Sequence, residues 1–381
     1  MTDANHMERL RRLTGAKWAR FDDDVIPAWV ADMDFPTAPV VSDALRELVD
    51  NGDLGYNIAS FDDRVVQAWA DWSERRFGWR PDPAASHLFS STLQPISMAL
   101  DVATEPGDGV VLFTPIYPPF LGIVEKSGRR LVEYRLDDTA RRIDANHLAA
   151  LVDDTTRAVL LCNPHNPTGR AFTAEELAAI ARVAEEHDLL VISDEIWQDF
   201  VYPGAAHIPF ASLGPEVAAR TVTMTSASKS FNLGGLSCAV AHLGAERVAE
   251  GYAALMPHLL GGVSVTGAVA ALTAWRHGKP WLDEIVATLH ASRDYLMARL
   301  AEELPQVGVT TPEATYLAWL DFRAMGLGDD PAKHLLEAGR VGLSSGPDFG
   351  TPGAGFARLN FATPRPVLDE IVDRMVRALG V

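Results

Sequence analysis

A lysine and an aspartate, 35 residues apart, are the two residues of this chain that most clearly suggest chemistry. Lys229 lies in the run TSASKSFNLGG (225–235), and Asp194 follows the run Val191–Ser193. An amine can form a Schiff base with an aldehyde, and a carboxylate can keep a pyridine nitrogen protonated so that the ring accepts electrons. The pair therefore meets the two main needs of a pyridine aldehyde cofactor, although Asp194 could instead be a helix N-cap.

Hydroxyl groups around Lys229 suggest a phosphate site. Ser226 and Ser228 flank the lysine, and serine hydroxyls can donate to phosphate oxygens. Thr92 and Leu93 come just before a helix predicted from about Pro95, and a helix N-terminus offers free amides and the positive end of a dipole. Taken alone, an exposed lysine in a serine-rich turn is the simpler interpretation, but the other motifs favour a cofactor.

Further candidates follow other predicted strands. The run CNPHNPTG (162–169) predicts a tight loop, from which Asn166 could donate to a phenolic oxygen, whereas His165 is more simply structural. Tyr117 could stack on a flat ring or pack in the core. Arg358, in the run FARLNF, could bind a carboxylate in a bidentate fork or form a surface ion pair. Glu195 is expected to serve structure.

Short apolar runs alternate with helical patterns in the middle of the chain, and Thr173–Glu176 has the form of a capping box. Strands separated by helices predict an α/β fold with a largely parallel sheet. Functional loops of such sheets lie at the carboxyl ends of the strands. The runs predicted as buried strands are Val110–Phe113, Ala158–Cys162, Leu189–Ser193, Thr221–Thr225 and Cys238–Leu243.

The ends of the chain differ from the middle. Residues 1–40 are predicted to be loop-like and to join a smaller α+β domain at residues 281–381, while residues 41–280 form the large domain. Within the smaller domain we expect a long helix over Trp281–Leu300 and strands over Thr315–Leu320 and Phe356–Phe361, followed by a terminal helix.

Composition narrows the class of protein. The chain has 381 residues, 48% of them hydrophobic, and a net charge of −18 without a basic block, which argues against nucleic-acid binding. No apolar run is long enough to span a bilayer and the N-terminus lacks a signal pattern, so we expect a soluble, cytoplasmic protein without membrane partners. Cys162 and Cys238 are expected to be buried, reduced thiols, and the histidines show no metal-ligand spacing. No Gly-x-Gly-x-x-Gly motif supports a dehydrogenase.

Together these motifs resemble the fold-type I, pyridoxal-phosphate-dependent aminotransferase superfamily (class I/II) over nearly the whole chain. Within it, the chain resembles the MalY/PatB-type cystathionine β-lyases, which are carbon–sulfur lyases. The resemblance implies the PLP-dependent transferase fold, with a mostly parallel seven-stranded sheet and a smaller α+β domain. The segments that carry it are Trp29–Pro36, Cys162–Gly169, Ser193–Ile196, His207–Ser212 and Ser228–Gly235.

The resemblance also implies roles for single residues. Lys229, Asp194 and Tyr117 would be catalytic: Lys229 would bind pyridoxal 5'-phosphate covalently, Asp194 would pair with the ring nitrogen, and Tyr117 would stack on the ring. The other cofactor-binding residues would be Asn166 at the phenolic oxygen, Ser226, Ser228, Thr92 and Leu93 at the phosphate, and Trp197 and Tyr56.

Substrate and subunit contacts follow from the same resemblance. Arg358 would bind the substrate carboxylate, and the segment Ala31–Asp34 would line the substrate mouth. Tyr56 matches a tyrosine that reaches the phosphate site and substrate of the neighbouring subunit, which implies a homodimer with shared active sites.

Three positions depart from the common aminotransferase pattern. Trp197 replaces a tyrosine and Ser237 replaces a phosphate-binding arginine, and the carbon–sulfur lyases lack both as well. The resemblance therefore implies β-elimination from S-substituted cysteines to thiol, pyruvate and ammonia. Thr92 stands where these lyases usually have glycine, which leaves room for a specialised biosynthetic substrate. The alternatives are an aminotransferase and a regulatory binding protein that retains the cofactor.

Overall fold

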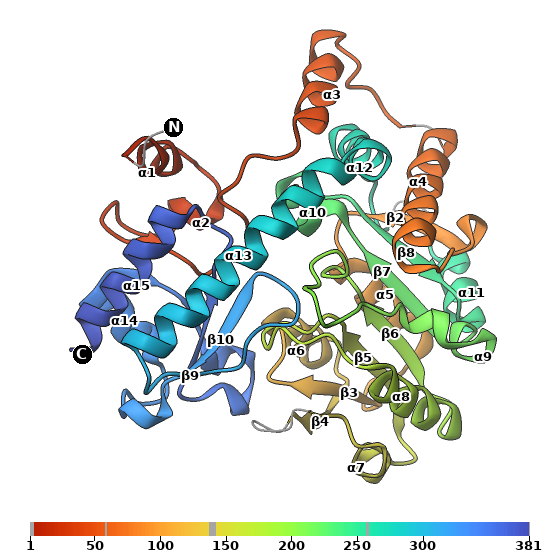
Figure 1. Cartoon of the computed structure of the whole chain (residues 1–381). Helices are drawn as coiled ribbons and strands as arrows, with labels where there is room; N and C mark the ends of the chain where they lie inside the picture. Colours follow the sequence, from red (N-terminus) through yellow and green to blue (C-terminus); the bar gives the residue numbers. More distant parts are fainter. Residues whose placement is uncertain (1–3, 58, 137–141, 257–258, 381) are drawn as a thin grey trace.

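The computed structural model describes residues 4–57, 59–136, 142–256 and 259–380. Within these ranges, the chain forms a seven-stranded sheet and a four-stranded sheet, and the long helix α13 (Lys279–Glu303), which runs diagonally across Figure 1, connects the two parts along the chain. This helix contains the predicted helix Trp281–Leu300 and extends it at both ends.

The large sheet has the strand order β2-β8-β7-β6-β5-β3-β4. Neighbouring strands are parallel except β8, which is antiparallel to both β2 and β7. The mostly parallel sheet is therefore confirmed, and Asp194 is the last residue of its strand rather than the first residue beyond it. The strands are β2 (Ser86–Phe89), β3 (Gly109–Thr114), β4 (Arg130–Arg135), β5 (Thr156–Cys162), β6 (Leu190–Asp194), β7 (Thr221–Thr225) and β8 (Ala239–Leu243).

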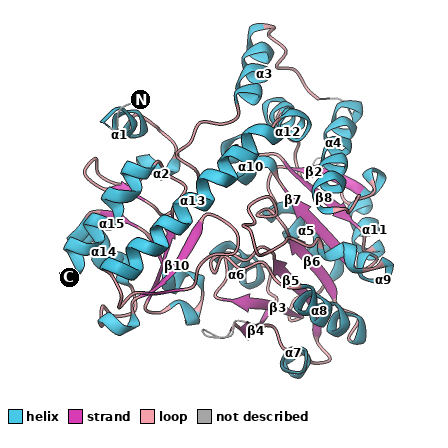
Figure 2. Ribbon diagram, in the orientation of Figure 1, coloured by secondary structure: helices cyan, strands magenta, loops and turns pink. Residues whose placement is uncertain are grey.

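Helices cover both faces of this sheet (Figure 2), which explains the nearly unbroken apolar runs of its strands. In β5, Ala158 and Leu160 join one apolar cluster, and Val159 and Leu161 join the other. The predicted capping box at Thr173 is present at the start of α8. The helices of this part of the chain are α4 (Ala59–Phe77), α5 (Leu93–Ala103), α6 (Pro118–Lys126), α7 (Ala145–Leu151), α8 (Ala174–Glu186), α9 (Pro215–Ala218), α10 (Ala227–Ser230), α11 (Glu246–Ala254) and α12 (Val265–His277).

The small sheet is antiparallel, with the order β12-β13-β10-β9. Its predicted strand over Thr315–Leu320 begins later than expected, because Thr315 has a φ of +66° and lies outside the extended region. The elements of this part are β9 (Gly308–Val309), β10 (Leu317–Asp321), β11 (Val341–Gly342), β12 (Ser344–Ser345), β13 (Phe356–Asn360), α14 (Pro331–Gly339) and α15 (Arg365–Leu379).

The N-terminal segment is more ordered than predicted. Instead of a loop, it forms α1 (Ala4–Arg11) and α2 (Ala16–Ala19), and the helix α3 (Pro39–Asp50) follows. Leu10 and Lys17 are buried, so contacts with the rest of the molecule stabilise helices that are too short to persist alone.

A short strand, β1 (Ile26–Pro27), pairs in parallel with β11, which places the N-terminal segment beside the small sheet (Figure 1). The limits of the two domains stay a prediction.

Two further features bear on the class of protein. Across the described ranges, no helix combines the length and apolar character needed to cross a bilayer. Cys162 and Cys238 are both buried and free, as predicted.

Candidate active site

A cavity of about 660 Å³ lies at the carboxyl ends of β3, β5, β6 and β7. Its opposite side is formed by the N-terminal segment and the small sheet. Apart from Tyr56 and residues 32–34 of the predicted substrate mouth, the predicted site residues all line this cavity. They are Ala31, Thr92, Leu93, Tyr117, Asn166, Asp194, Trp197, Ser226, Ser228, Lys229 and Arg358.

Lys229 lies in α10, directly after β7. Its Nζ donates to the Ala31 carbonyl at 2.7 Å and lies 5.9 Å from the centre of the Trp197 ring. Burial lowers the pKa of the Lys229 ammonium, and the nearby Arg358 charge acts in the same direction. A lowered pKa increases the neutral fraction of the amine, which is the form that attacks an aldehyde.

Asp194 is 3% exposed at the end of β6. Burial raises the pKa of Asp194 to about 6, although hydrogen bonds from the Ile196 amide and the Thr92 hydroxyl oppose the shift. A buried carboxylate of this kind is stabilised by a cationic partner such as a protonated ring nitrogen. The Thr92 hydroxyl thus favours the charged form of Asp194, an effect that the sequence did not predict.

Arg358 projects from β13 and is 4% exposed. Its Nη1 donates to Asn166 Oδ1 at 2.9 Å, and its Nη2 donates to the Trp29 carbonyl at 2.7 Å and to Ser344 Oγ at 3.1 Å. Burial lowers the pKa of Arg358 to about 10, so the side chain keeps its charge at neutral pH. Its Nε is buried and has no hydrogen-bond acceptor among the described residues.

The predicted phosphate donors differ in availability. The Ser226 hydroxyl caps α10 by accepting from the Ser228 amide at 3.0 Å, and it donates to the Cys238 carbonyl at 2.5 Å. Its hydrogen is thereby used within the protein. The amides at the start of α5, near Thr92 and Leu93, lack intrahelical acceptors and lie at the positive end of the helix dipole.

Aromatic rings complete the cavity. Tyr117 precedes α6 and meets the Phe120 ring edge-on at 5.7 Å, while Trp197 packs against Tyr316 at 4.8 Å. Burial raises the pKa of the Tyr117 phenol, so this ring remains neutral. Neutral aromatic faces of this kind suit a flat heterocyclic ring.

Glu195 and His165 make contacts that agree with structural roles. Glu195 accepts from Ser193 Oγ and the Phe210 amide, both at 2.9 Å, and pairs with His207 Nε2 at 3.0 Å. His165 contacts Thr168 Oγ1 at 2.9 Å and the Phe113 carbonyl at 3.1 Å.

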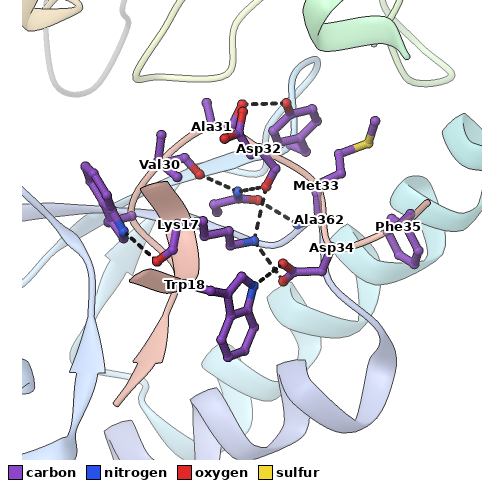
Figure 3. Close-up of polar contacts among 12 residues, drawn as sticks. Lys17, Trp18, Val30, Ala31, Asp32, Met33, Asp34, Phe35 and Ala362 are labelled. Carbon is purple, nitrogen blue, oxygen red and sulfur yellow. Dashed lines mark hydrogen bonds and ion pairs between the residues drawn. The ribbon is translucent and has the colours of Figure 1, made fainter. Parts of the chain in front are cut away.

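Sequence reasoning missed several contacts around the segment Val30–Asp34. Tyr316 donates its hydroxyl to the Ala31 carbonyl at 2.9 Å, and Asn360 donates to the carbonyls of Val30 and Asp32. Figure 3 shows this segment held by polar contacts on both sides. The sequence around Tyr316 does not indicate a functional residue, because Tyr316 directly precedes an ordinary apolar strand. Asn360 could have been found, because it lies two residues after Arg358 in the run FARLNF.

Tyr56 lies outside the cavity and is fully exposed. Other exposed apolar side chains in the same part of the chain and in the loop after α11 are Leu54, Met256 and Leu259. Asn57 donates to the Val263 carbonyl at 3.3 Å, so the two loops adjoin.

The residues present fit the cofactor that the sequence resemblance implies. A partly buried amine, an acid whose pKa is raised by burial, free helix amides and two aromatic rings surround one cavity. Lys229 could hold an aldehyde, Asp194 a pyridine nitrogen, and the start of α5 a phosphate. Arg358, a cation in the cavity lining, could serve a substrate carboxylate.

Comparison with known proteins agrees with this fold. Residues 29–375 match the aminotransferase class I and II family, and the chain belongs to that family. Its relatives include cystathionine beta-lyase PatB of Bacillus subtilis, which is 38% identical over 94% of this chain and 93% of its own length. Protein MalY of Escherichia coli is 31% identical over 93% of this chain and 92% of its own length.

A solved structure extends the comparison to three dimensions. The PLP-bound C-S lyase from Staphylococcus hominis superposes with a TM-score of 0.91 at 29% identity, covering 97% of this chain and 96% of that one. The chain thus has the type I PLP-enzyme fold with its large, mostly parallel sheet, as the sequence predicted.

Proposed function

We propose that this protein is a pyridoxal-phosphate-dependent carbon–sulfur β-lyase that cleaves S-substituted cysteines to thiol, pyruvate and ammonia. The observation that supports it most is the gathering of Lys229, Asp194 and Arg358 around one cavity in a chain whose relatives PatB and MalY share 31–38% identity with it. The name of PatB points to cystathionine as a substrate to test.

Several residues of this chain would hold the cofactor and the substrate. Lys229 bonds to the aldehyde, Asp194 faces the ring nitrogen, Tyr117 and Trp197 contact the ring, and Asn166 donates to the phenolic oxygen. The amides near Thr92 and Leu93, with Ser228, bind the phosphate. When bound there, pyridoxal phosphate supplies an electron-accepting ring for the charge that develops at Cα of the substrate.

The chain's own groups then perform the proton transfer. Arg358, which lines the cavity, binds the substrate carboxylate and so orients the Cα–H bond. The neutral Lys229 amine, favoured by its lowered pKa, removes the Cα proton as a general base. The electrons of the Cα–H bond form a Cα–Cβ double bond as the Cβ–S bond breaks, and the sulfur leaves with its electron pair as thiol or thiolate. Water then hydrolyses the released aminoacrylate to pyruvate and ammonia.

The test is a product assay on purified protein loaded with pyridoxal phosphate. Cystathionine is supplied without any oxo acid, and pyruvate and thiol are measured together. We expect both products in equal amounts. Turnover that requires an added oxo acid would instead support an aminotransferase, because both reactions begin with removal of the same proton by the same lysine.

Two features favour elimination over transamination. Trp197 and Ser237 replace a tyrosine and an arginine that many aminotransferases carry, and both line this cavity. A panel of S-substituted cysteines in the same assay would define the leaving group. Absence of turnover on the whole panel, with cofactor bound, would support the regulatory binding protein instead.

We also propose a homodimer in which Tyr56 of one subunit reaches the phosphate end of the other subunit's cavity. The full exposure of Tyr56 beside the exposed apolar residues Leu54, Met256 and Leu259 supports this proposal. Light scattering that gives the mass of a single chain at working concentration would reject it.

A further inference from the structure

The backbone of the segment Val30–Asp34 is fixed by side chains from distant parts of the chain. Asn360 Nδ2 donates to the carbonyls of Val30 and Asp32, both at 2.7 Å. Between them, the Ala31 carbonyl accepts from the Tyr316 hydroxyl at 2.9 Å and from Lys229 Nζ at 2.7 Å. The lysine therefore binds an oxygen that the small sheet already holds in place.

A buried ion pair anchors the other side of this segment. Lys17 Nζ lies 2.8 Å from Asp34 Oδ2, and both side chains are almost fully buried. Trp18 Nε1 donates to Asp34 Oδ1 at 2.7 Å, and Lys17 also donates to the Asp32 carbonyl (Figure 3). A buried pair with additional hydrogen bonds is costly to break, so it restricts the positions that the segment can adopt.

This arrangement places a carboxylate beside the catalytic amine. Asp32 Oδ1 lies 3.9 Å from Lys229 Nζ, and the Asp32 side chain is 41% exposed. The other charged groups that shift the pKa of Lys229 are Asp194 and Arg358. The centre of the Trp197 ring lies 5.9 Å from Lys229 Nζ. Asp32 is therefore in ion-pair contact with Lys229. Unlike Asp194, it has no proposed role in holding the cofactor ring.

We propose that the Ala31 carbonyl and the Asp32 carboxylate form the docking site for the Lys229 amine whenever that amine is not bonded to the cofactor. Asp32 is then a positioning residue, which stabilises the ammonium form after Lys229 has taken the Cα proton. The C–H electrons remain on the substrate, and the proton forms the third N–H bond of Lys229. The inference depends on the proposed role of Lys229 as the cofactor lysine.

The proposed docking site predicts how the pKa of Lys229 changes when Asp32 is replaced. Removal of an anion at this distance destabilises the ammonium, so the pKa of Lys229 falls further and more amine is neutral at a given pH. Because Asp32 is partly exposed, solvent weakens the interaction, and an effect of about fivefold on the neutral fraction is expected.

The test uses cofactor-free, full-length protein. Pyridoxal phosphate is added over a range of pH, and the second-order rate of its capture is followed by the visible absorbance of the lysine-bound cofactor. We expect Asp32→Asn to capture it about fivefold faster than the wild type on the acidic side of the profile, because capture needs the neutral amine. The two rates should converge at high pH, where the amine is neutral in both proteins.

Two variants serve as controls. Asp32→Glu keeps the charge and should restore the wild-type profile, and Asp23→Asn removes an exposed carboxylate that lies outside the segment Val30–Asp34 and should leave the profile unchanged. Coincident profiles of Asp32→Asn and the wild type would overturn the docking site while leaving the lyase assignment intact. A wild type that captures no cofactor would reject the proposed function itself.

Discussion

One side of the cavity, the sheet wall (Tyr117, Asn166, Asp194 and Lys229), comes from the carboxyl ends of strands in a single sheet. The other side, the facing wall (Trp29–Ala31 and Arg358), comes from the N-terminal segment and the small sheet, and Tyr316 donates a hydrogen bond to its Ala31 carbonyl. Strand ends place the first group, whereas hydrogen bonds to backbone carbonyls place the second. The sheet wall thus follows from local sequence, and the facing wall depends on contacts between residues that are far apart in the chain.

The largest effect is expected at the point where the two walls meet. Lys229→Ala removes the only amine in the sheet wall and its bond to the Ala31 carbonyl. Turnover should fall by about a thousandfold or more, and the visible absorbance of the bound cofactor should be lost with it. Full turnover in this variant, measured by pyruvate release, would show that Lys229 takes no part in the reaction.

A second prediction concerns Asp194 of the sheet wall, whose buried carboxylate lowers the free energy of unfolding of the cofactor-free protein. The pKa of Asp194 rises from 3.8 in the unfolded chain to about 6 in the native state. Between these values the native state holds a proton that the unfolded chain releases, so stability is lost as the pH rises toward and past 6. Asp194→Asn removes this penalty, which amounts to at most about 3 kcal/mol near pH 7.5.

The measurement is urea unfolding of cofactor-free protein at about pH 4 and about pH 7.5. The Asn variant should gain stability relative to the wild type as the pH rises, while losing affinity for the cofactor. Asp23→Asn, an exposed carboxylate, is the control and should show no such gain. A constant difference between Asp194→Asn and wild type at both pH values would contradict the assigned shift.

The smallest effect is expected in the facing wall. Tyr316→Phe removes the hydroxyl that fixes the Ala31 carbonyl, and a neutral hydrogen bond of this kind contributes roughly 1 kcal/mol. We expect kcat to fall about fivefold with KM nearly unchanged. Tyr202→Phe is a matched control, because the Tyr202 hydroxyl donates to the Thr315 carbonyl and does not contact Ala31. Equal loss of kcat in both variants would show that the effect is only structural.

The same contrast explains what the sequence could predict. Apolar strands followed by loops identified the central strands and the positions of Asn166, Asp194 and Lys229, because the carboxyl ends of parallel strands share one edge. The edge strand β4 was missed, since three of the six residues in its sequence RLVEYR are charged and interrupt any apolar run. The assignment of individual roles, such as phosphate contacts and substrate binding, stays a prediction.

The N-terminal helices and the facing wall were beyond local reasoning. The prolines at 27, 36 and 39 suggested a loop, but α1 and α2 precede them and depend on packing against other parts of the chain. The contact of Tyr316 with Ala31 joins residues 285 positions apart, and no periodicity in a single sequence reveals such a pair.

The two cysteines of the chain line this cavity. Burial raises the pKa of Cys238 to about 12, and it raises that of Cys162 further still. Both sulfurs are therefore protonated at neutral pH and are weak nucleophiles. An enzyme that handles an aldehyde and releases thiols would thus keep two sulfhydryl groups beside its reactants without forming adducts or mixed disulfides with them.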